Sequence, residues 1–239
     1  MGWNPFSTAS NYPQMLRKIA MFTFACALLA VSLVRAQVPD VDSWLSRYSI
    51  QVPLFGGVSL PFGTILPALA VALLFRMFKV HDRISDLFRI RHTFDVNHII
   101  KPMALGVGIV LSKVALVRVR NERQEIMHDV FYRYASGTEG KAAIDSHYVT
   151  LALDQWSWFW IVLEAEAIAL LTAIVLLIAG VWFSAGVLIA ADLVVIGVLR
   201  LIWQGCTRYA RAEIDQILDD EQRKHDIARA FHALQGETP

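Results

Sequence analysis

Residues 156–177 read WSWFWIVLEAEAIALLTAIVLL, an apolar stretch long enough for a helix that crosses a bilayer. The stretch contains two glutamates, Glu164 and Glu166, although carboxylates inside hydrocarbon are rare and costly. If the membrane segment begins at Trp156, Glu166 lies about 15 Å inside it, whereas a segment that begins near Ala167 leaves both glutamates at the interface. We favour an intermediate placement, with the tryptophans at the headgroups and both glutamates in the inner leaflet.

The composition is that of a membrane protein with substantial aqueous parts. Of the 239 residues, 56% are hydrophobic and 18% are charged, and the mean hydropathy is +0.46. The formal net charge of +1 gives no basis for direct binding of nucleic acid. Cys26 and Cys206 indicate neither a disulfide framework nor a zinc site.

Four apolar segments approach the roughly 20 residues that a membrane-crossing helix needs. Backbone groups in lipid must pair internally, so we predict an all-α polytopic integral membrane protein with four transmembrane helices and a mainly helical cytoplasmic domain. The segments are 16–38, 61–78, 156 to about 180, and 184–203. The predicted parts are an N-terminal transmembrane hairpin (1–78), a cytoplasmic domain (79–155), a C-terminal transmembrane hairpin (156–203) and a cytoplasmic amphipathic tail helix (204–239).

The first segment also resembles a signal peptide, because basic residues precede its apolar core and Ala36 follows it. Arg35 at the candidate cleavage point and the length of the apolar run favour an uncleaved span instead.

Lysine and arginine are biased toward one side of the predicted membrane segments. The turn at 179–186 has no charge, and the link between the first two segments has Arg47 beside Asp40 and Asp42. We therefore expect a multi-pass protein of the inner (plasma) membrane with both termini cytoplasmic, although Arg35 lies at the outer end of the first span. The residues behind this expectation are Arg17, Lys18, Arg76, Lys79, Arg83, Arg89, Arg91, Arg200, Arg208 and Arg211.

The predicted cytoplasmic region begins with an amphipathic pattern. Ile84, Leu87, Phe88 and Arg91 follow helical spacing, and the basic residues of this segment could rest on anionic headgroups. That basic set is Lys79, Arg83, Arg89 and Arg91.

Residues 103–117 are apolar but short for a span, and Lys113 interrupts them. A span here would reverse the downstream topology, so we interpret the segment as the buried core of the domain or as an element pressed against the bilayer. Gly106 and Gly108 leave a strand open for part of it.

Two further helices are predicted near the C-terminal hairpin. One begins at Lys141, after a break at 136–140 (SGTEG), and could continue into the third span. The other is the tail from Arg208 to Leu234, whose apolar stripe needs a partner in this chain or in another. We expect a homo-oligomer that depends partly on this stripe, which comprises Ile214, Ile217, Leu218 and Phe231.

The polar motifs predict no catalytic, cofactor or metal site. Residues 106–113 (GVGIVLSK) depart from the phosphate-loop and dinucleotide patterns. His92, Asp95 and His98 are spaced so that one helix cannot direct both histidines to one metal. The sequence at 144–147 (IDSH) places Asp, Ser and His side by side, where they do not face one another on a helix. Polar helix surface and headgroup contact are the expected roles of His81, His92, His98, His128 and His147.

Asp192 lies near the middle of the fourth apolar segment, and ionisable residues at that depth are candidates for function. Glu166 is its first candidate partner, and Arg76 and Arg200 are possible ion-pair partners for the glutamates. Two roles stay open for these groups: ion pairing that orients packed helices, or a proton or cation pathway.

Three classes of function remain. The first is a non-enzymatic membrane subunit that oligomerises and presents a cytoplasmic domain to a soluble protein, as sensor, effector or scaffold, for instance in a bacterial stress or defence system. The second is a small oligomeric channel or a proton or cation pathway that uses Asp192 and Glu166. The third is a membrane enzyme, which the missing catalytic motifs make the weakest candidate. We expect the bilayer, other copies of the chain and a cytoplasmic protein as partners, and no cofactor.

Overall fold

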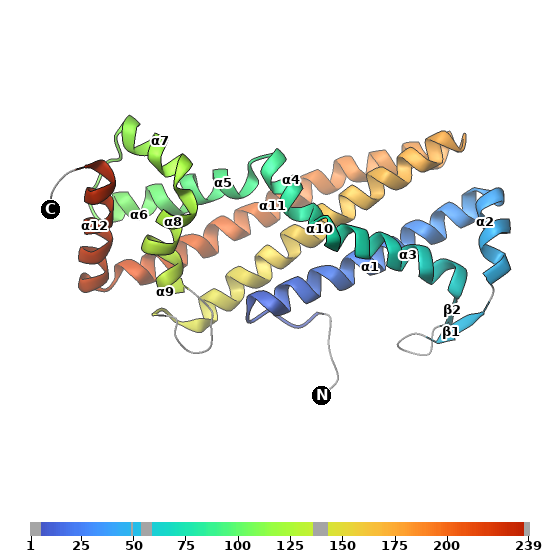
Figure 1. The fold of residues 1–239 in the computed structure, drawn as a ribbon, viewed down its shortest axis with the longest axis horizontal. Coiled ribbons are helices and arrows are strands. Elements are labelled where there is room, and N and C mark those ends of the chain that lie inside the picture. Colours follow the sequence, from blue (N-terminus) through green and yellow to red (C-terminus); the bar gives the residue numbers. More distant parts are fainter. Residues whose placement is uncertain (1–5, 49, 54–58, 136–142, 237–239) are drawn as a thin grey trace.

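The computed structural model describes residues 6–48, 50–53, 59–135 and 143–236, and it is mostly helical (Figure 1). Four long helices run along the molecule: α1 (Tyr12–Gln37), α3 (Phe62–Met77), α10 (Ser146–Ile178) and α11 (Trp182–Leu218). At one end, which we call the hairpin end, lie α2 (Pro39–Leu45), η1 (Ser46–Tyr48), β1 (Gln51–Pro53) and β2 (Ser59–Pro61).

Short helices gather at the opposite end and cover the extensions of α10 and α11. We call this part the helical domain. Its helices are α4 (Val80–Leu87), α5 (Ile90–Phe94), α6 (Lys101–Gly106), α7 (Lys113–Asn121), α8 (Arg123–Met127), α9 (Arg133–Ala135) and α12 (Glu221–Gln235), with the π-helical segments η3 (Asp95–Ile100) and η4 (His128–Tyr132).

Three of the long helices, α1, α10 and α11, are long and apolar enough to cross a membrane. The pair α3 and α4 passes the same test together, but it bends by 52° at the break between them. The structure therefore confirms a helical fold with three candidate spans, or four if the bent pair forms one span.

The four long helices pack in the order α3, α1, α10, α11, so that α1 has a neighbour on each side. At the hairpin end β1 and β2 form an antiparallel pair, with Val52 opposite Leu60. The start of α3 then passes so close to α2 that a Cβ atom on Gly63 would lie 2.2 Å from the carbonyl oxygen of Leu45. Only glycine fits this approach without a shift of the backbone.

The extensions of α10 and α11 are part of the core of the helical domain. α10 runs unbroken from Ser146, where Asp145 caps it, into the apolar segment. The start expected at Lys141 and the break at 136–140 lie outside the described residues. Residues 103–117 form α6, a loop and α7, and none of them is a strand or a membrane-spanning helix.

The tail differs from the single helix predicted for 204–239. The fourth long helix continues to Leu218, and the chain turns before α12 begins at Glu221. The side chain of Asp220 accepts a hydrogen bond from the backbone of Arg223, 2.9 Å away, and so caps the new helix. The turn folds α12 back against α6 and α7.

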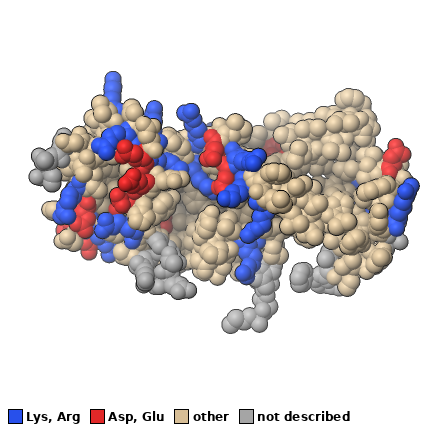
Figure 2. All heavy atoms as spheres, viewed as in Figure 1, with Lys and Arg blue, Asp and Glu red and all other residues tan. Residues whose placement is uncertain are grey.

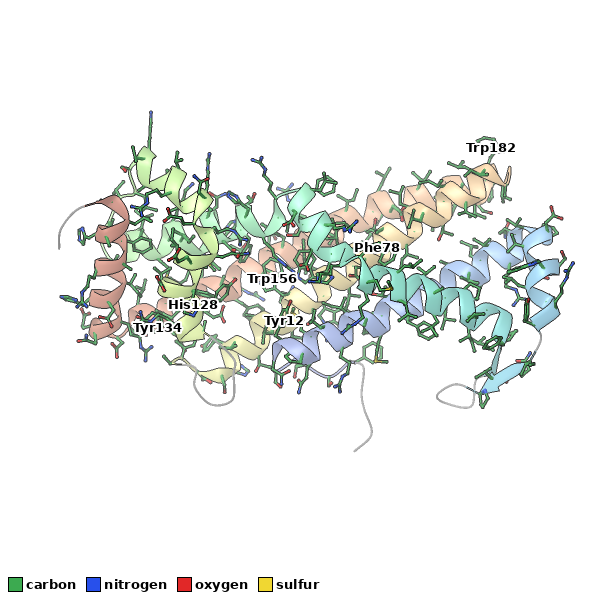
Figure 3. The ribbon with its side chains drawn as sticks, in the orientation of Figure 1. Tyr12, Phe78, His128, Tyr134, Trp156 and Trp182 are labelled. Carbon is green, nitrogen blue, oxygen red and sulfur yellow. The ribbon has the colours of Figure 1, made fainter. Side chains whose placement is uncertain are left out.

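Charge is distributed unevenly along the molecule. Figure 2 shows lysine, arginine and acidic residues over the helical domain, an uncharged band beyond it, and a few charges at the hairpin end. Phe78 and Trp156 lie near the domain side of this band, and Trp182 lies at its other end (Figure 3). From Trp156 to Ile178, α10 rises by about 33 Å, close to the thickness of a hydrocarbon core.

The aromatic cluster at 156–160 forms part of the protein core, not a belt that faces headgroups as predicted. Phe159 and Trp160 are 5% and 2% exposed. Phe94 packs edge-on against Trp156 and Trp203, with ring centres 4.7 Å and 5.1 Å away. The sequence could not reveal this packing, because the covering residue comes from a distant segment of the chain.

Candidate functional site

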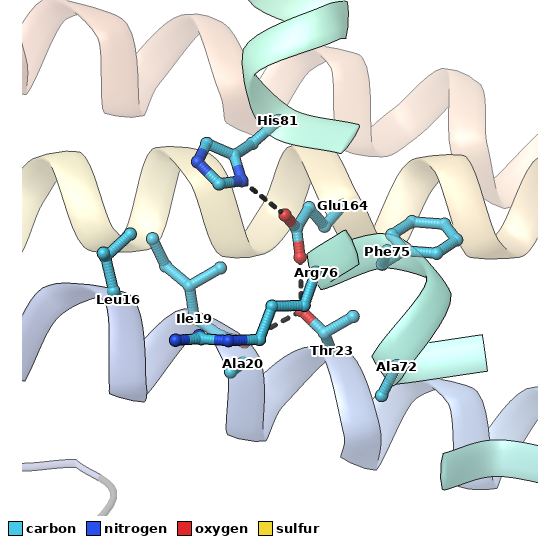
Figure 4. Close-up of a pocket in the computed structure, with 9 residues that line it drawn as sticks. All are labelled: Leu16, Ile19, Ala20, Thr23, Ala72, Phe75, Arg76, His81 and Glu164. Carbon is cyan, nitrogen blue, oxygen red and sulfur yellow. Dashed lines mark hydrogen bonds and ion pairs between the residues drawn. The ribbon is translucent and has the colours of Figure 1, made fainter. Parts of the chain in front are cut away.

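Glu164 is the most deeply buried of the three predicted intramembrane carboxylates, with 3% of its surface exposed. It projects from α10 toward α1, where its Oε2 atom is hydrogen-bonded to the hydroxyl of Thr23 (Figure 4). Thr23 is also 3% exposed, and its hydroxyl lies 2.8 Å from the carbonyl oxygen of Ile19. Sequence analysis did not select Thr23, because a helical threonine often bonds only to its own backbone.

His81 of α4 is the second partner of Glu164, with its Nδ1 atom 3.1 Å from Oε1. α4 reaches this position because the chain bends sharply after α3, with Lys79 in the left-handed region at φ 46°. His81 was expected at a polar helix surface. Its contact with a residue 83 positions away cannot be inferred from local spacing.

Two more residues extend these contacts toward the surface of the helical domain. His81 Nε2 lies 3.6 Å from Asp82 Oδ1, which is an ion-pair distance but longer than a hydrogen bond. Arg91 Nη1 lies 2.5 Å from the same oxygen, and its guanidinium lies 5.0 Å from the ring centre of Trp160. Together, Thr23, Glu164, His81, Asp82 and Arg91 form a continuous series of polar groups that we call the junction network.

A small cavity of about 30 Å³ borders the junction network where α1, α3, α4 and α10 meet (Figure 4). Its volume suffices for one or two water molecules. Arg76 of α3 lines the cavity, so this predicted partner does lie at the Glu164 site, although its own side chain is exposed. The apolar part of the lining comes from Leu16, Ile19, Ala20, Ala72 and Phe75.

Glu166 and Asp192 occupy the other side of α10. The two carboxylates are close enough for their charges to interact, as predicted, but both are only half-buried. Asp192 is therefore not enclosed between helices of the single chain, and the adjacent Leu193 and Val194 are 67% and 70% exposed. Arg200 is exposed and, among the described residues, forms no ion pair with these carboxylates.

A second buried charge joins α1 to α10 and was not predicted as a site. Lys18 is 5% exposed, and its Nζ atom lies 2.7 Å from Asp154 and 4.5 Å from the ring centre of Trp158. Sequence analysis used Lys18 only as evidence for orientation. Its position three residues after Met15 and one before Ile19, both buried, was the available signal for an inward-facing lysine.

Arg35, the charge that disagreed with the predicted orientation, is neutralised at the hairpin end. Its guanidinium lies 2.7 Å from Asp42 and 2.5 Å from the hydroxyl of Thr64. Gln37 and Ser184, whose side chains lie 3.0 Å apart, connect the end of α1 to the start of α11.

The predicted amphipathic helix with a basic face is divided in two. The break falls at Arg89, which adopts φ 52°, so Arg91 turns inward to Asp82 while Lys79, Arg83 and Arg89 stay exposed. Leu87 and Phe88 are 76% and 69% exposed beside these basic residues. Of the predicted basic set, Arg91 is therefore used in an internal ion pair, and the other three residues remain at the surface.

The helical domain contains its own buried ion pair. Asp95 is 6% exposed and is bonded to Arg123. Burial raises the pKa of Asp95 to about 6, against the lowering effect of the Arg123 charge. The ring of His98 packs at an angle against Phe94 and edge-on against Trp203, with ring centres 5.3 Å and 5.9 Å away. The described residues hold no group of three or more His, Cys, Asp or Glu side chains arranged for a metal ion.

The predicted assembly stripe lies within the chain's own core. Ile214, Ile217 and Phe231 are 4%, 0% and 1% exposed, and Leu218 contacts Gly106 of α6. The stripe therefore has its partner in the same chain. Homo-oligomerisation stays a prediction, but it needs a different surface.

Comparison with known proteins gives a family and a relative. A model of the YmfE protein family matches residues 11–233. The chain is 27% identical over 189 residues to a protein of Escherichia coli (strain K12) named "Uncharacterized protein YmfE", and the match covers 72% of each chain. No solved structure matches the chain.

Proposed function

The chain belongs to the YmfE protein family, and we propose that it is a non-enzymatic, multi-pass subunit of the inner membrane that presents its helical domain to a soluble cytoplasmic protein. Both termini are cytoplasmic in this proposal. The bias of lysine and arginine toward the helical domain supports the orientation (Figure 2).

The observation that carries the proposal is an exposed apolar surface on α7 and the loop before it. Val110, Val114 and Val117 are 77%, 74% and 55% exposed, and Val114 and Val117 share one face of α7. Exposed apolar groups of this kind mark interaction surfaces when lipid does not cover them.

This surface lies in the helical domain against the C-terminal end of α12, where Arg118 donates to the carbonyl of Leu234 and Gln235 donates to the carbonyl of Val110. α6 contacts Leu218, which lies 15 residues beyond Trp203. At the helical rise this is about 22 Å along the axis of α11, so a bilayer that surrounds the band does not reach Leu218, and Figure 1 shows α7 in the same end of the molecule, among the short helices. Lys113, Arg118 and Arg120 flank the valines, so a partner with an acidic rim around an apolar patch fits best.

The continuity of α10 and α11 supports the coupling of such a domain to the membrane. Both helices run from the apolar segment into the core of the helical domain without a break. A partner that binds at α7 can therefore act on the membrane segments through packed, rigid elements.

Site-specific photo-crosslinking in intact cells tests the proposal. A photoreactive residue at Val114 should give one discrete adduct with a soluble protein, and Val117→Glu should abolish it. The same probe at exposed Glu125 of α8 is the matched control and should give no such adduct. An adduct of twice the mass of the chain, or labelling of lipid alone at Val114, would reject a soluble partner at this surface.

Reporter fusions test the orientation separately. Fusions after Arg120 and at the C-terminus should both report a cytoplasmic location. A periplasmic signal from either one contradicts the topology on which the proposal depends.

A further inference from the structure

We propose that the junction network is a proton-exchange site, in which Glu164 binds a proton inside the helix bundle and exchanges it through His81 with the surface of the helical domain. The proposal concerns a different part of the molecule from the α7 surface and does not depend on the identity of any partner.

The hydroxyl of Thr23 lies between two oxygen atoms that can both accept a hydrogen bond. The hydroxyl has one hydrogen but two acceptors in reach, the carbonyl of Ile19 at 2.8 Å and Glu164 Oε2. If Glu164 is a carboxylic acid, its O–H donates to Thr23 when the proton is on Oε2, and to His81 when the proton is on Oε1; in either case Thr23 can donate to Ile19. If Glu164 is a carboxylate, Thr23 must leave one of the two acceptors without a full bond. Both protonation states are accommodated, and neither leaves a buried donor without an acceptor.

The imidazole of His81 lies between Glu164 and Asp82. His81 directs Nδ1 to Glu164 and Nε2 toward Asp82, so each ring nitrogen faces a carboxyl group. In one state, neutral His81 carries its proton on Nε2, and Glu164, protonated on Oε1, donates to Nδ1. In the other, Glu164 is a carboxylate and His81 is an imidazolium whose Nε2–H faces Asp82. The exchange breaks the Oε1–H bond of Glu164 and forms the Nδ1–H bond of His81, and the imidazolium then releases its Nε2 proton to Asp82 or to water.

Charged groups surround the site. Arg76 from α3, His81 and Asp82 from α4 and Arg91 from α5 face it. From α1 come Thr23 and Cys26, whose thiol lies close enough to interact with the Glu164 charge. Glu166, on α10 itself, points to the other side of the helix. A guanidinium at the cavity disfavours a bound metal cation, whereas the cavity of about 30 Å³ admits the water that proton exchange needs.

Proton exchange at Glu164 also affects the contact between α4 and α10. His81 is the contact by which α4 is bonded to α10 at Glu164. That contact is a charge-assisted bond in one protonation state and a neutral bond in the other, which differ about twofold in strength. Protonation of Glu164 therefore changes how firmly α4 is attached to the bundle.

Infrared spectroscopy of the full-length protein in lipid vesicles tests the proposal. Because Asp95 is also a buried carboxyl group, the informative quantity is the difference between the spectra of the wild type and Glu164→Gln. This difference should contain the C=O stretch of a protonated carboxylic acid, with an intensity that changes with pH. Glu166→Gln, a change on the same helix two residues away, should retain this band. His81→Asn should shift the frequency of the same band, because Glu164 loses the imidazole that lies 3.1 Å from its Oε1 atom.

Other results would overturn the proposal. If the spectra of the wild type and Glu164→Gln do not differ in this region at any pH, proton exchange at Glu164 is excluded, and a band that disappears in Glu166→Gln belongs to another carboxyl group. If Glu164→Gln does not fold, Thr23→Val gives an independent answer. It removes the hydrogen-bond partner of the acid and should shift the frequency of the band, so an unshifted band would contradict the assignment to Glu164.

Discussion

α1 and α11 are both long, apolar candidate spans, but they are buried at different places. α1 contacts α3 and α10 and buries Lys18 and Thr23 on the side that faces them, while Leu29 on its outer side is 72% exposed. α11 is open over most of its apolar half, where Leu193, Val194 and Ile196 are 67%, 70% and 56% exposed. Apart from Ala185 near its start, its buried residues begin at Cys206. Length and hydropathy alone therefore do not distinguish a helix held by the bundle from one held by the helical domain.

The interface of α1 should depend most on its buried charge. Lys18→Met leaves Asp154 without its partner in a half-buried position, and removal of one partner of a buried ion pair costs about 3–5 kcal/mol. We expect the free energy of unfolding to fall by this amount at neutral pH. Arg17→Met is the matched control, because Arg17 is the exposed neighbour, and it should change stability by less than about 0.5 kcal/mol. Equal effects of the two substitutions would contradict the buried interface of α1.

A pair of substitutions on α11 tests where that helix is held. Ile217 is fully buried in the helical domain, so Ile217→Ala should cost about 2–5 kcal/mol, as large-to-small changes in a core do. Ile196→Ala removes the same atoms from the exposed half of the helix and should be nearly neutral. Thermal unfolding of the two variants, in the same detergent, measures the difference. A large loss for Ile196→Ala would reveal a second copy of the chain, or another protein, packed against the open half.

The sequence predicted the parts of this comparison that depend on neighbouring residues. Runs of apolar residues located the four long helices, and helical spacing located the stripe at Ile214 and Ile217. Whether the stripe packs within the chain depends on the turn at Asp220, which spacing does not determine. The polar partners of Glu164 come from α1 and α4, and such contacts depend on the angles at which helices pack, not on local pattern.

The candidate site was therefore predicted in part. Depth in an apolar run drew attention to Glu164, Glu166 and Asp192 together, because all three are carboxylates in such segments. It could not rank them, since burial differs between the two faces of α10. The α1 face encloses Glu164 completely, whereas the α11 face leaves Glu166 and Asp192 half-buried.

The pH dependence of stability at Asp95 tests the packing of η3, the segment of the helical domain that begins at Asp95 and contacts α11. The pKa of Asp95 is about 6 in the folded protein, above the ordinary value of 3.8. At any pH between these two pKa values, the folded state therefore binds more protons than the unfolded state. The contribution of Asp95 to stability is therefore greatest at low pH and decreases as pH rises toward 6, by as much as roughly 3 kcal/mol.

Asp95→Asn should remove that dependence. The difference in unfolding free energy between wild type and variant, measured by denaturant titration at several pH values, should change across the window from about 4 to 6 and then become constant. Asp129→Asn, at an exposed carboxylate in the same domain, serves as the control and should give a flat difference. A flat difference for Asp95→Asn would mean that its charge is not desolvated and that η3 does not close over it.

The smallest effect concerns the open half of α11 itself. A Cβ atom on Gly197 would meet nothing within 4 Å, so Gly197→Ala should only add helix propensity and raise stability by about 0.5–1 kcal/mol. Gly63→Ala is the opposite case, because its Cβ would lie 2.2 Å from the carbonyl oxygen of Leu45, and it should destabilise the protein. The sign at Gly197, measured as the shift of the thermal midpoint, is informative despite its size. A stabilised variant fits a helix that faces lipid. A destabilised variant with a lower oligomeric mass would show that another helix approaches closely at Gly197. α11 would then pack against a second chain, just as α1 packs against α3 and α10 within one chain.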